Sequence, residues 1–406
     1  MLKNRSQIIS FIGIIVIAMF FCASMVTASV AVSAVAISAE PDAGPTPVPA
    51  PAPRAGLEPA PATPTLAARA GLEPAPTRIP NPRPKPTPSP TPKPIRKELL
   101  GFDMYSFKSG QAAYSLMEKN KDLLTSIASS TYSIGKSGEL LGRIADWQVS
   151  FANKNKITPI LLVTNSFDNE VSKSLLADPK AQATAIDNMA KVLKLGNYRG
   201  INIDFESVYA ADRDKYTEFI KQTYLKLHPK GYMVTVSVPA KSVDDPRKTW
   251  VYAYDYKSIG KYSDRILIMT YDEHYKKGSP GPVASFGWVK SVMTYAASVI
   301  PPNKLYLGLS AYGYDWGANI GVSYSVEGCY NLASSHNAKI EFDPVAKCPH
   351  FDYTDSDGTK HQVWFENDES ISYKLELVKS LKLKGVGVWR MGTMDKNYWD
   401  MLRKKL

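Results

Sequence analysis

The amino-acid sequence predicts an α/β protein, a (β/α)8 TIM barrel with a small α+β insertion between its seventh and eighth strands. From Glu98 onwards, eight short apolar runs alternate with segments of helical period, which is the pattern of a parallel barrel. The stretch from Glu98 to Leu406 holds 309 residues. One barrel of this kind needs roughly 250, so a single large domain with an insertion fits better than two domains.

The eight runs are the expected barrel strands, in chain order. They are rich in aliphatic and β-branched residues and span 99–105, 125–134, 157–165, 200–206, 232–240, 265–272, 305–313 and 385–392. Helical spacing predicts helices between them, for example at 186–193 before Gly196, at 216–227 before Gly231 and at 289–296. The last two runs are about 56 residues apart, from Tyr314 to about Glu369, and this interval is the expected insertion.

Residues 1–39 are expected to form a signal peptide or an N-terminal membrane anchor. Lys3 and Arg5 precede an uncharged run from Ile8 to Ala39, which has the basic start and apolar core of a secretory signal. The run also exceeds the ~20 residues that span a bilayer. Both alternatives export the rest of the chain. We therefore expect an extracytoplasmic protein, secreted or membrane-anchored, in contact with the cell wall.

Residues 40–97 are expected to be a disordered, proline-rich spacer ahead of the domain at 98–406. Nineteen of the 30 prolines lie there, and the octapeptide RAGLEPAP occurs at 54–61 and again at 69–76. Alternating prolines favour polyproline II or extended backbone and leave little to bury. Such a segment holds a domain away from a surface.

Charge and cysteine content narrow the range of partners. The net charge is +11, but the charges of the globular part are scattered along the sequence, so nucleic acid is not an expected partner. In an oxidising compartment a disulfide between Cys329 and Cys348 is the default expectation, with free thiols as the alternative. Their spacing from His350 and His361 fits no zinc motif. We expect a monomer without metal or cofactor.

The fourth run, GINIDFE at 200–206, carries polar residues where a core strand should be apolar. Side chains alternate across a strand, so Asn202, Asp204 and Glu206 share the face that points into the barrel. Glu206 lies at the carboxyl end of the strand, where such barrels hold their active sites. The Cα atoms of Asp204 and Glu206 should be roughly 6.5 to 7 Å apart, close enough to raise the pKa of at least one carboxyl. The alternative, a purely structural polar plug, would cost several kcal/mol to bury.

Two other strand ends contribute suitable side chains. The sixth strand ends in Met269, Tyr271 and Asp272, and the eighth carries Trp389. Trp389 alone would be ordinary core packing. Beside acids and tyrosines it is better interpreted as an aromatic floor for a sugar ring, whose C–H faces stack on indole.

These residues carry a resemblance to glycoside hydrolase family 18, over about 98–406, and within it to the spore-germination and cortex-lytic N-acetylglucosaminidase branch. The motif D-G-x-D-x-D-x-E of that family aligns with residues 199–206, M-x-Y-D aligns with 269–272, and GVGVWRMG at 385–392 matches the strand that supplies the family's tryptophan. Arg199 and Asn202 replace the first two acids of the motif. Phe102 stands where many relatives have a tyrosine, so a hydroxyl contact is missing there.

The resemblance implies substrate-assisted retaining hydrolysis without a metal, an exception to the two-carboxylate rule. Glu206 would be the acid and base, Asp204 would stabilise the charged intermediate, and Tyr271 would orient the substrate's acetamido group. Asn202, Met269, Asp272, Trp389 and Phe102 would contact the sugar. The expected substrate is an N-acetylated glycan. Peptidoglycan is favoured, with the chitinase alternative and a catalytically silent glycan-binding barrel kept open.

Overall fold

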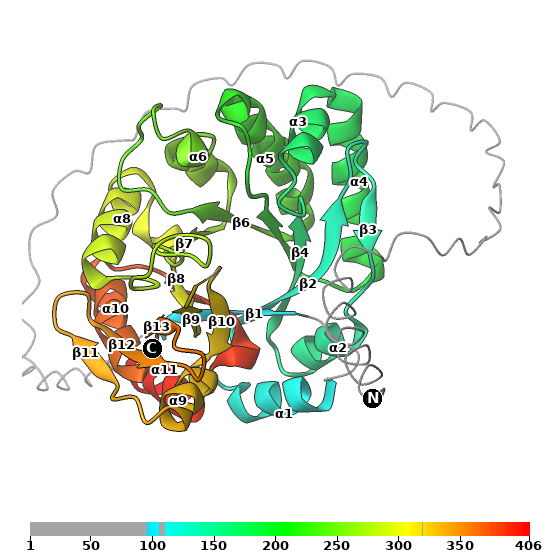
Figure 1. Ribbon diagram of the computed structural model, residues 1–406. Helices are drawn as coiled ribbons and strands as arrows, with labels where there is room; N and C mark the ends of the chain where they lie inside the picture. The colour runs from blue at the N-terminus through cyan, green and yellow to red at the C-terminus, as the bar shows by residue number, and fades with distance from the viewer. Residues whose placement is uncertain (1–95, 105–109, 319) are drawn as a thin grey trace, which may run out of the picture. The chain divides into compact units, whose positions relative to one another are not determined.

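Eight parallel strands close into a barrel with helices around it (Figure 1). This computed structural model describes residues 96–104, 110–318 and 320–406, all within one compact unit, Pro88–Leu406. The predictions for residues 1–39, and for 40–97 up to residue 95, lie outside the described residues. Within the described ranges, no helix combines the length and the hydropathy that a membrane span requires.

The barrel strands confirm the predicted fold. Strand β1 pairs in parallel with both β2 and β14, which closes the sheet. The eight strands are β1 (Glu98–Asp103), β2 (Ser126–Ile134), β4 (Thr158–Thr164), β5 (Gly200–Asp204), β6 (Met233–Pro239), β7 (Arg265–Met269), β8 (Leu305–Ser310) and β14 (Gly385–Trp389). A short strand that was not predicted, β3 (Leu140–Gly142), pairs antiparallel with β2.

The helices form the outer layer and begin at recognisable caps. Asp168 and Asp178 accept backbone N–H bonds at the starts of α3 and α4, and Pro179 occupies the first turn of α4. The helices are α1 (Gly110–Asn120), α2 (Asp146–Lys154), α3 (Asn169–Ala177), α4 (Pro179–Leu195), α5 (Arg213–Leu227), α6 (Thr249–Tyr252), α7 (Tyr256–Ile259), α8 (Phe286–Val299), α10 (Asp368–Ser380) and α11 (Lys396–Lys405).

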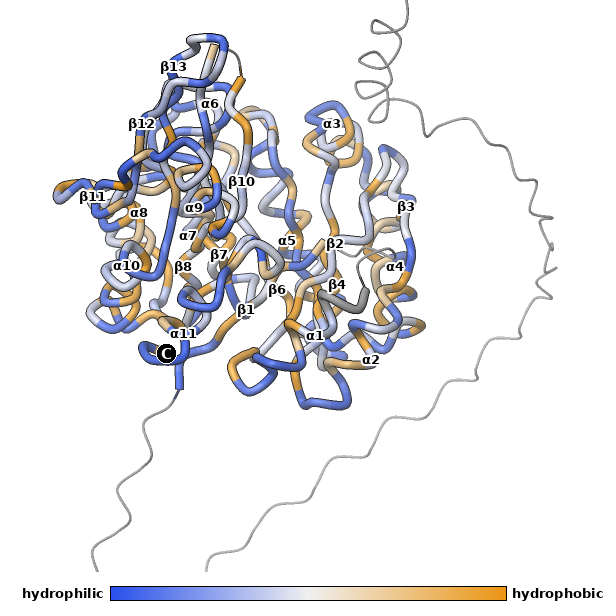
Figure 2. The backbone as a smooth tube through the Cα atoms, turned by 60° about the horizontal axis from the view of Figure 1, so that its bottom comes forward, coloured by the Kyte–Doolittle hydropathy of each residue, from blue (hydrophilic) through white to orange (hydrophobic). Residues whose placement is uncertain are grey.

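Alternation along the strands divides the buried side chains into two cores. Ile201 and Ile203 of β5, and Phe205 directly after it, face the helices, where the Phe205 ring stacks on Phe219 with centroids 5.6 Å apart. The barrel lumen holds a separate cluster that includes Phe102 and Met269. In Figure 2 the hydrophobic segments accordingly run through the central strands, while hydrophilic stretches dominate the loops.

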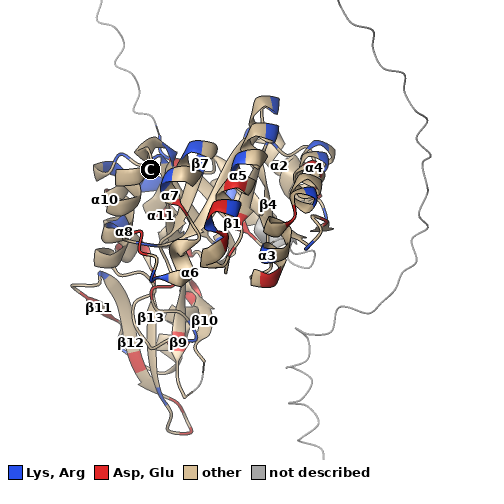
Figure 3. Cartoon of the chain, turned by 90° about the horizontal axis from the view of Figure 1, so that it is seen from above, with Lys and Arg blue, Asp and Glu red and all other residues tan. Residues whose placement is uncertain are grey.

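The run predicted as the seventh strand, 305–313, divides at Ala311. Its first part is barrel strand β8, and its second part begins β9 (Tyr312–Trp316), which belongs to a separate five-stranded antiparallel sheet. The other members of this insertion are β10 (Val322–Ser325), α9 (Val326–Ser335), β11 (Glu341–Asp343), β12 (Cys348–Thr354) and β13 (Lys360–Phe365). The insertion projects from the end of the barrel at which the strands finish (Figure 3).

The expected disulfide is wrong for this structure, because Cys329 and Cys348 are both free and buried. Cys329, on α9, packs in one apolar cluster with Phe351 of β12. Cys348 is three residues from Phe351 on the same strand and therefore lies on its opposite face. There the Cys348 thiol donates to the carbonyl of Ala284, 3.4 Å away. The strand itself separates the two sulfur atoms.

Candidate active site

The polar face of β5 begins with Asn202, which is fully buried. Its Nδ2 donates to Thr235 Oγ1 at 2.9 Å, and its Oδ1 accepts from Ser237 Oγ at 2.9 Å. Both partners belong to β6. Asn202 is therefore held beneath the mouth of the barrel by its neighbouring strand. The sugar contact predicted for Asn202 stays a prediction.

Asp204 and Glu206 follow on the same face, and the structure places both in a poorly hydrated setting. Asp204 Oδ1 is buried without a hydrogen-bond partner among the described residues. Burial raises the pKa of the Asp204 carboxyl. Burial also raises the pKa of Glu206, and the negative charges of Asp204 and Asp272 raise it further. Two carboxyls in this arrangement retain a proton near neutral pH, as a general acid requires.

The backbone of Glu206 is clamped by Asn165, a buried residue that follows β4. Asn165 Oδ1 accepts from the Glu206 N–H at 2.9 Å, and Asn165 Nδ2 donates to the Glu206 carbonyl at 2.6 Å. On the other side, the Tyr254 hydroxyl donates to the carbonyl of Phe205 at 2.9 Å. Sequence patterns did not single out Asn165 or Tyr254, because both contacts join segments more than 40 residues apart.

The end of β7 brings a tyrosine and a third acid to the same place. Burial and the charges of Asp204 and Glu206 raise the pKa of Tyr271, so its hydroxyl stays protonated and can donate. Asp272 has a left-handed backbone, φ 61°, which aspartate tolerates. Its Oδ1 accepts from the hydroxyls of Tyr312 at 2.6 Å and Tyr314 at 3.0 Å. Both tyrosines come from β9, so the insertion contributes to the site.

A cavity of about 550 Å³ joins most of these side chains. The cavity is lined by four of the predicted site residues: Glu206, Met269, Tyr271 and Asp272. It is also lined by four aromatic residues that the sequence analysis did not single out: Phe167, Trp250, Tyr275 and Trp288. Trp250 and Phe167 are 57% and 65% exposed. Large exposed aromatic surfaces beside carboxyls suit a sugar ring. Phe167 follows β4, Trp250 lies on α6, and Tyr275 and Trp288 follow β7. Periodicity along the sequence cannot associate residues from such separate segments.

Trp389 and Phe102 pack together, with ring centroids 5.9 Å apart. Phe102 is buried at 2% exposure in the lumen cluster, against which Trp389 packs. The sugar contact predicted for Phe102 stays a prediction. Arg199 is distant from the site. It lies at the start of β5, where its Nε donates to Asn153 Oδ1 at 3.0 Å.

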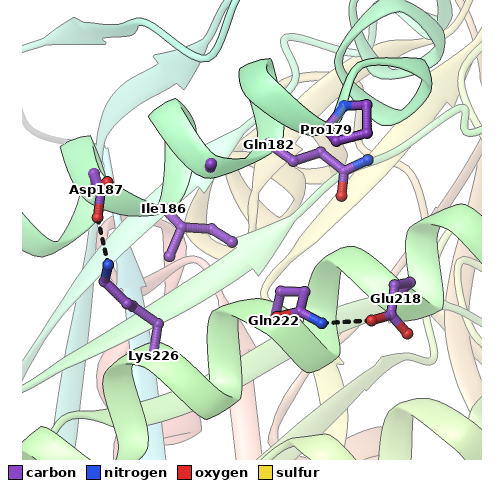
Figure 4. A pocket seen from close by; sticks show the side chains of 8 residues that line it. Pro179, Gln182, Ile186, Asp187, Glu218, Gln222 and Lys226 are labelled. Atoms are coloured by element: carbon purple, nitrogen blue, oxygen red, sulfur yellow. Dashed lines mark hydrogen bonds and ion pairs between the residues drawn. The ribbon is translucent and has the colours of Figure 1, made fainter.

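A second cavity, of about 480 Å³, lies in the helical layer between α4 and α5 (Figure 4). Its polar groups satisfy each other: Asp187 pairs with Lys226 at 2.8 Å, and Gln222 donates to Glu218 at 2.5 Å. It holds none of the predicted site residues. Among the described residues no group of three or more His, Cys, Asp or Glu could hold a metal ion.

Comparison with known proteins decides the family. The model of glycosyl hydrolases family 18 matches residues 109–395. The chain belongs to glycosyl hydrolases family 18. The uncharacterized glycosylase YvbX of Bacillus subtilis is 35% identical over 302 residues, which cover 72% of this chain and 88% of YvbX. As a member of family 18, the protein is a glycosidase that acts on glycans containing N-acetylglucosamine.

Two solved structures resemble this chain along most of its length. The spore cortex-lytic enzyme SleL of Bacillus megaterium has a TM-score of 0.73 and 29% identity, covering 78% of this chain and 76% of SleL. A chitinase from Chromobacterium violaceum has a TM-score of 0.72 and 29% identity, covering 76% of this chain and 99% of the chitinase.

Proposed function

We propose that this glycosidase is exported and cleaves the β-1,4 bonds next to N-acetylglucosamine in peptidoglycan, including the spore cortex form, by substrate-assisted retaining catalysis. The observation that carries the proposal is the Asp204–Glu206 pair at the end of β5, with raised pKa values beside an aromatic cavity.

Glu206 is the proton donor. Its raised pKa keeps the carboxyl protonated at neutral pH, and it lines the cavity, so it can protonate the glycosidic oxygen. As the bond breaks, the carbonyl oxygen of the substrate's 2-acetamido group attacks the anomeric carbon and forms an oxazolinium ion. The Glu206 carboxylate then removes a proton from a water molecule as that water attacks the anomeric carbon. The attack opens the oxazolinium ring and leaves the anomeric configuration retained.

Asp204 and Tyr271 bind and orient the acetamido group of the substrate. Asp204 would accept the acetamido N–H and stabilise the positive charge that develops. No described residue donates a hydrogen bond to its buried Oδ1. The protonated Tyr271 hydroxyl would donate to the acetamido oxygen and hold it for attack. This chemistry needs an N-acetylated sugar at the cleavage site, in agreement with the family. Trp389, supported by Phe102, would form the floor of the sugar site.

Peptidoglycan is favoured by the likeness to the cortex-lytic SleL and by the predicted export signal and spacer, which suit action on the wall. Chitin oligosaccharides are the second candidate, because the C. violaceum chitinase is equally identical, at 29%. A catalytically silent glycan-binding barrel is disfavoured, because the acid Glu206 is present and faces the cavity.

A substrate panel tests the assignment. Residues 88–406 are incubated with cortex peptidoglycan, vegetative peptidoglycan and chitin oligomers, and the new reducing ends are identified by mass spectrometry after borohydride reduction. We expect N-acetylglucosamine at the new ends from peptidoglycan, and little cleavage of chitin. Muramic acid at the new reducing ends would refute the proposed cleavage after N-acetylglucosamine. Faster cleavage of chitin than of peptidoglycan would favour the second candidate function, a chitinase.

A further inference from the structure

The lysines and arginines, scattered along the sequence, gather at one end of the folded barrel. This end, where the strands begin, lies opposite the insertion and the active site, and Lys and Arg cluster there in Figure 3. We define it as the basal face, made of nine segments that lead into or close the strand starts: 96–98, 118–125, 152–158, 191–199, 226–233, 260–265, 300–305, 379–384 and 403–406.

The basal face is strongly cationic. Its nine segments hold 20 Lys and Arg against four Asp and Glu, a side-chain charge of +16. The rest of residues 96–406 holds 21 against 30, a charge of −9. The domain therefore carries its positive charge at one end, although its overall charge is moderate. A field of this kind attracts anionic partners to the basal face and repels them elsewhere.

Half of these cations have no partner of their own. Lys226 pairs with Asp187 (Figure 4), and Lys384 pairs with Glu98. In the described part of the chain, by contrast, the ammonium groups of ten exposed basal lysines make no ion pair within 4 Å and no side-chain hydrogen bond: Lys119, Lys154, Lys156, Lys191, Lys194, Lys230, Lys261, Lys379, Lys382 and Lys404. These ammonium groups are free to meet anionic groups outside the domain.

Helix ends explain only part of the pattern. The macrodipole favours a cation within the last helical turn, as for Lys154 and Lys194. Lys156, Arg199 and Lys382, however, lie beyond the ends of α2, α4 and α10. The macrodipole therefore does not account for the whole excess of positive charge.

The placement of the free lysines indicates the shape of the partner. They lie in the last turns of, or just beyond, α1, α2, α4, α5, α7, α10 and α11, and so are distributed around the barrel end. A single polymer strand would reach only part of such a ring, whereas a flat anionic surface can face all of it. The preceding chain also joins the domain here, because the Lys97 N–H donates to the carbonyl of Leu406 at 3.3 Å. That chain carries the apolar run Ile8–Ala39, which is expected to be a signal peptide or, if it is retained, a membrane anchor.

We propose that the basal face docks the domain on a bilayer of anionic phospholipids. Docking of this end directs the active-site cavity away from the membrane, towards glycan beyond it. The proposal does not depend on which glycan is cleaved, because its test measures membrane binding alone.

The test is sedimentation of the domain, Pro88–Leu406, with vesicles. The match with the C. violaceum chitinase covers 99% of that chain, so this barrel with its insertion folds without further domains. The vesicles are phosphatidylcholine, alone or mixed with phosphatidylglycerol. A basal variant combines the substitutions K191Q, K194Q, K230Q, K261Q, K379Q and K382Q. A matched control combines K136Q, K248Q, K276Q, K277Q, K290Q and K360Q, six exposed lysines outside the basal face whose side chains likewise make no ion pair with a described residue.

Both variants lose six positive charges, so they differ only in where the charge was. Each lysine near an anionic bilayer contributes about fivefold to binding, and we expect the basal variant to bind phosphatidylglycerol vesicles at least about 100-fold more weakly. The control should stay within about threefold of wild type, and binding should fall with salt. Circular dichroism confirms that both variants are folded.

Three outcomes would overturn the proposal. Equal loss in the two variants would show that net charge alone drives binding. Unchanged binding in the basal variant would exclude the face. Tighter binding to soluble poly(glycerol phosphate) than to phosphatidylglycerol vesicles would identify a wall polymer as the partner instead.

Discussion

Replacing Asn165 tests whether the position of Glu206, apart from its chemical identity, determines the rate of catalysis. Its side chain takes part in four hydrogen bonds, two to the Glu206 backbone and two to Asp168 O at 3.1 Å and Ser172 Oγ at 2.8 Å. Asn165→Ala would leave the N–H and carbonyl of Glu206 without these partners. An unpaired buried polar group costs about 1–3 kcal/mol, so the variant should lose about 3 kcal/mol of unfolding free energy.

The effect on catalysis should fall on kcat. A displacement of the acid by about 1 Å costs on the order of 100-fold in rate, while the substitution removes no side chain from the aromatic cavity proposed to bind the sugar. We expect kcat on peptidoglycan fragments to fall about 100-fold with KM within about threefold. Urea unfolding measures the stability, and steady-state kinetics below the unfolding transition measure the rate.

Ser172→Ala is the matched control, because it removes one Asn165 contact on the side away from Glu206. It should lose about 1 kcal/mol with kcat unchanged. If folded Asn165→Ala keeps the wild-type kcat, or if Ser172→Ala loses as much activity, the clamp does not position Glu206.

Other variants probe the electrostatics and the thiols. The raised pKa of Glu206 means that the folded state keeps a proton that the unfolded state loses above its usual pKa, so wild-type stability should fall between pH 5 and 8. Glu206→Gln should reduce this dependence of stability on pH and raise the free energy of unfolding by about 1 kcal/mol at pH 8. A urea unfolding midpoint equal to that of the wild type at pH 8 would contradict this prediction. Asn202→Asp should place a second carboxyl beside Asp204 and cost about 1–3 kcal/mol at pH 7, with the loss shrinking at pH 5; equal losses at both pH values would argue against it. Cys329 and Cys348 should react with iodoacetamide only after unfolding, and a disulfide-linked peptide in a non-reducing digest would count against two free thiols.

Periodicity predicted the barrel because it depends on local pattern. All eight strands were found where apolar runs alternate with helical segments, and the inward face of β5 followed from side-chain alternation. The division of the seventh run at Ala311 could not be predicted, because both halves are apolar and only their pairing partners differ.

The site was predictable where its residues share a strand and not where they come together through folding. Asp204 and Glu206 are two residues apart, so side-chain alternation alone predicts that they share one face. Asn165, Tyr254 and Trp250 reach the site from segments that follow other strands, Trp250 from helix α6, and have no distinctive local pattern. The disulfide prediction failed for the same reason. The sequence alone does not show that Cys348 and Cys329 lie on opposite faces of β12, because this depends on how β12 packs in the insertion.

The most direct measurement is the release of muropeptides from peptidoglycan by wild-type protein and by Glu206→Gln, with circular dichroism to confirm equal folding. Loss of a general acid typically costs 100- to 10,000-fold, so we predict that release by Glu206→Gln falls by at least about 100-fold. Release at the wild-type rate by the folded variant would contradict the assignment of Glu206 as the proton donor.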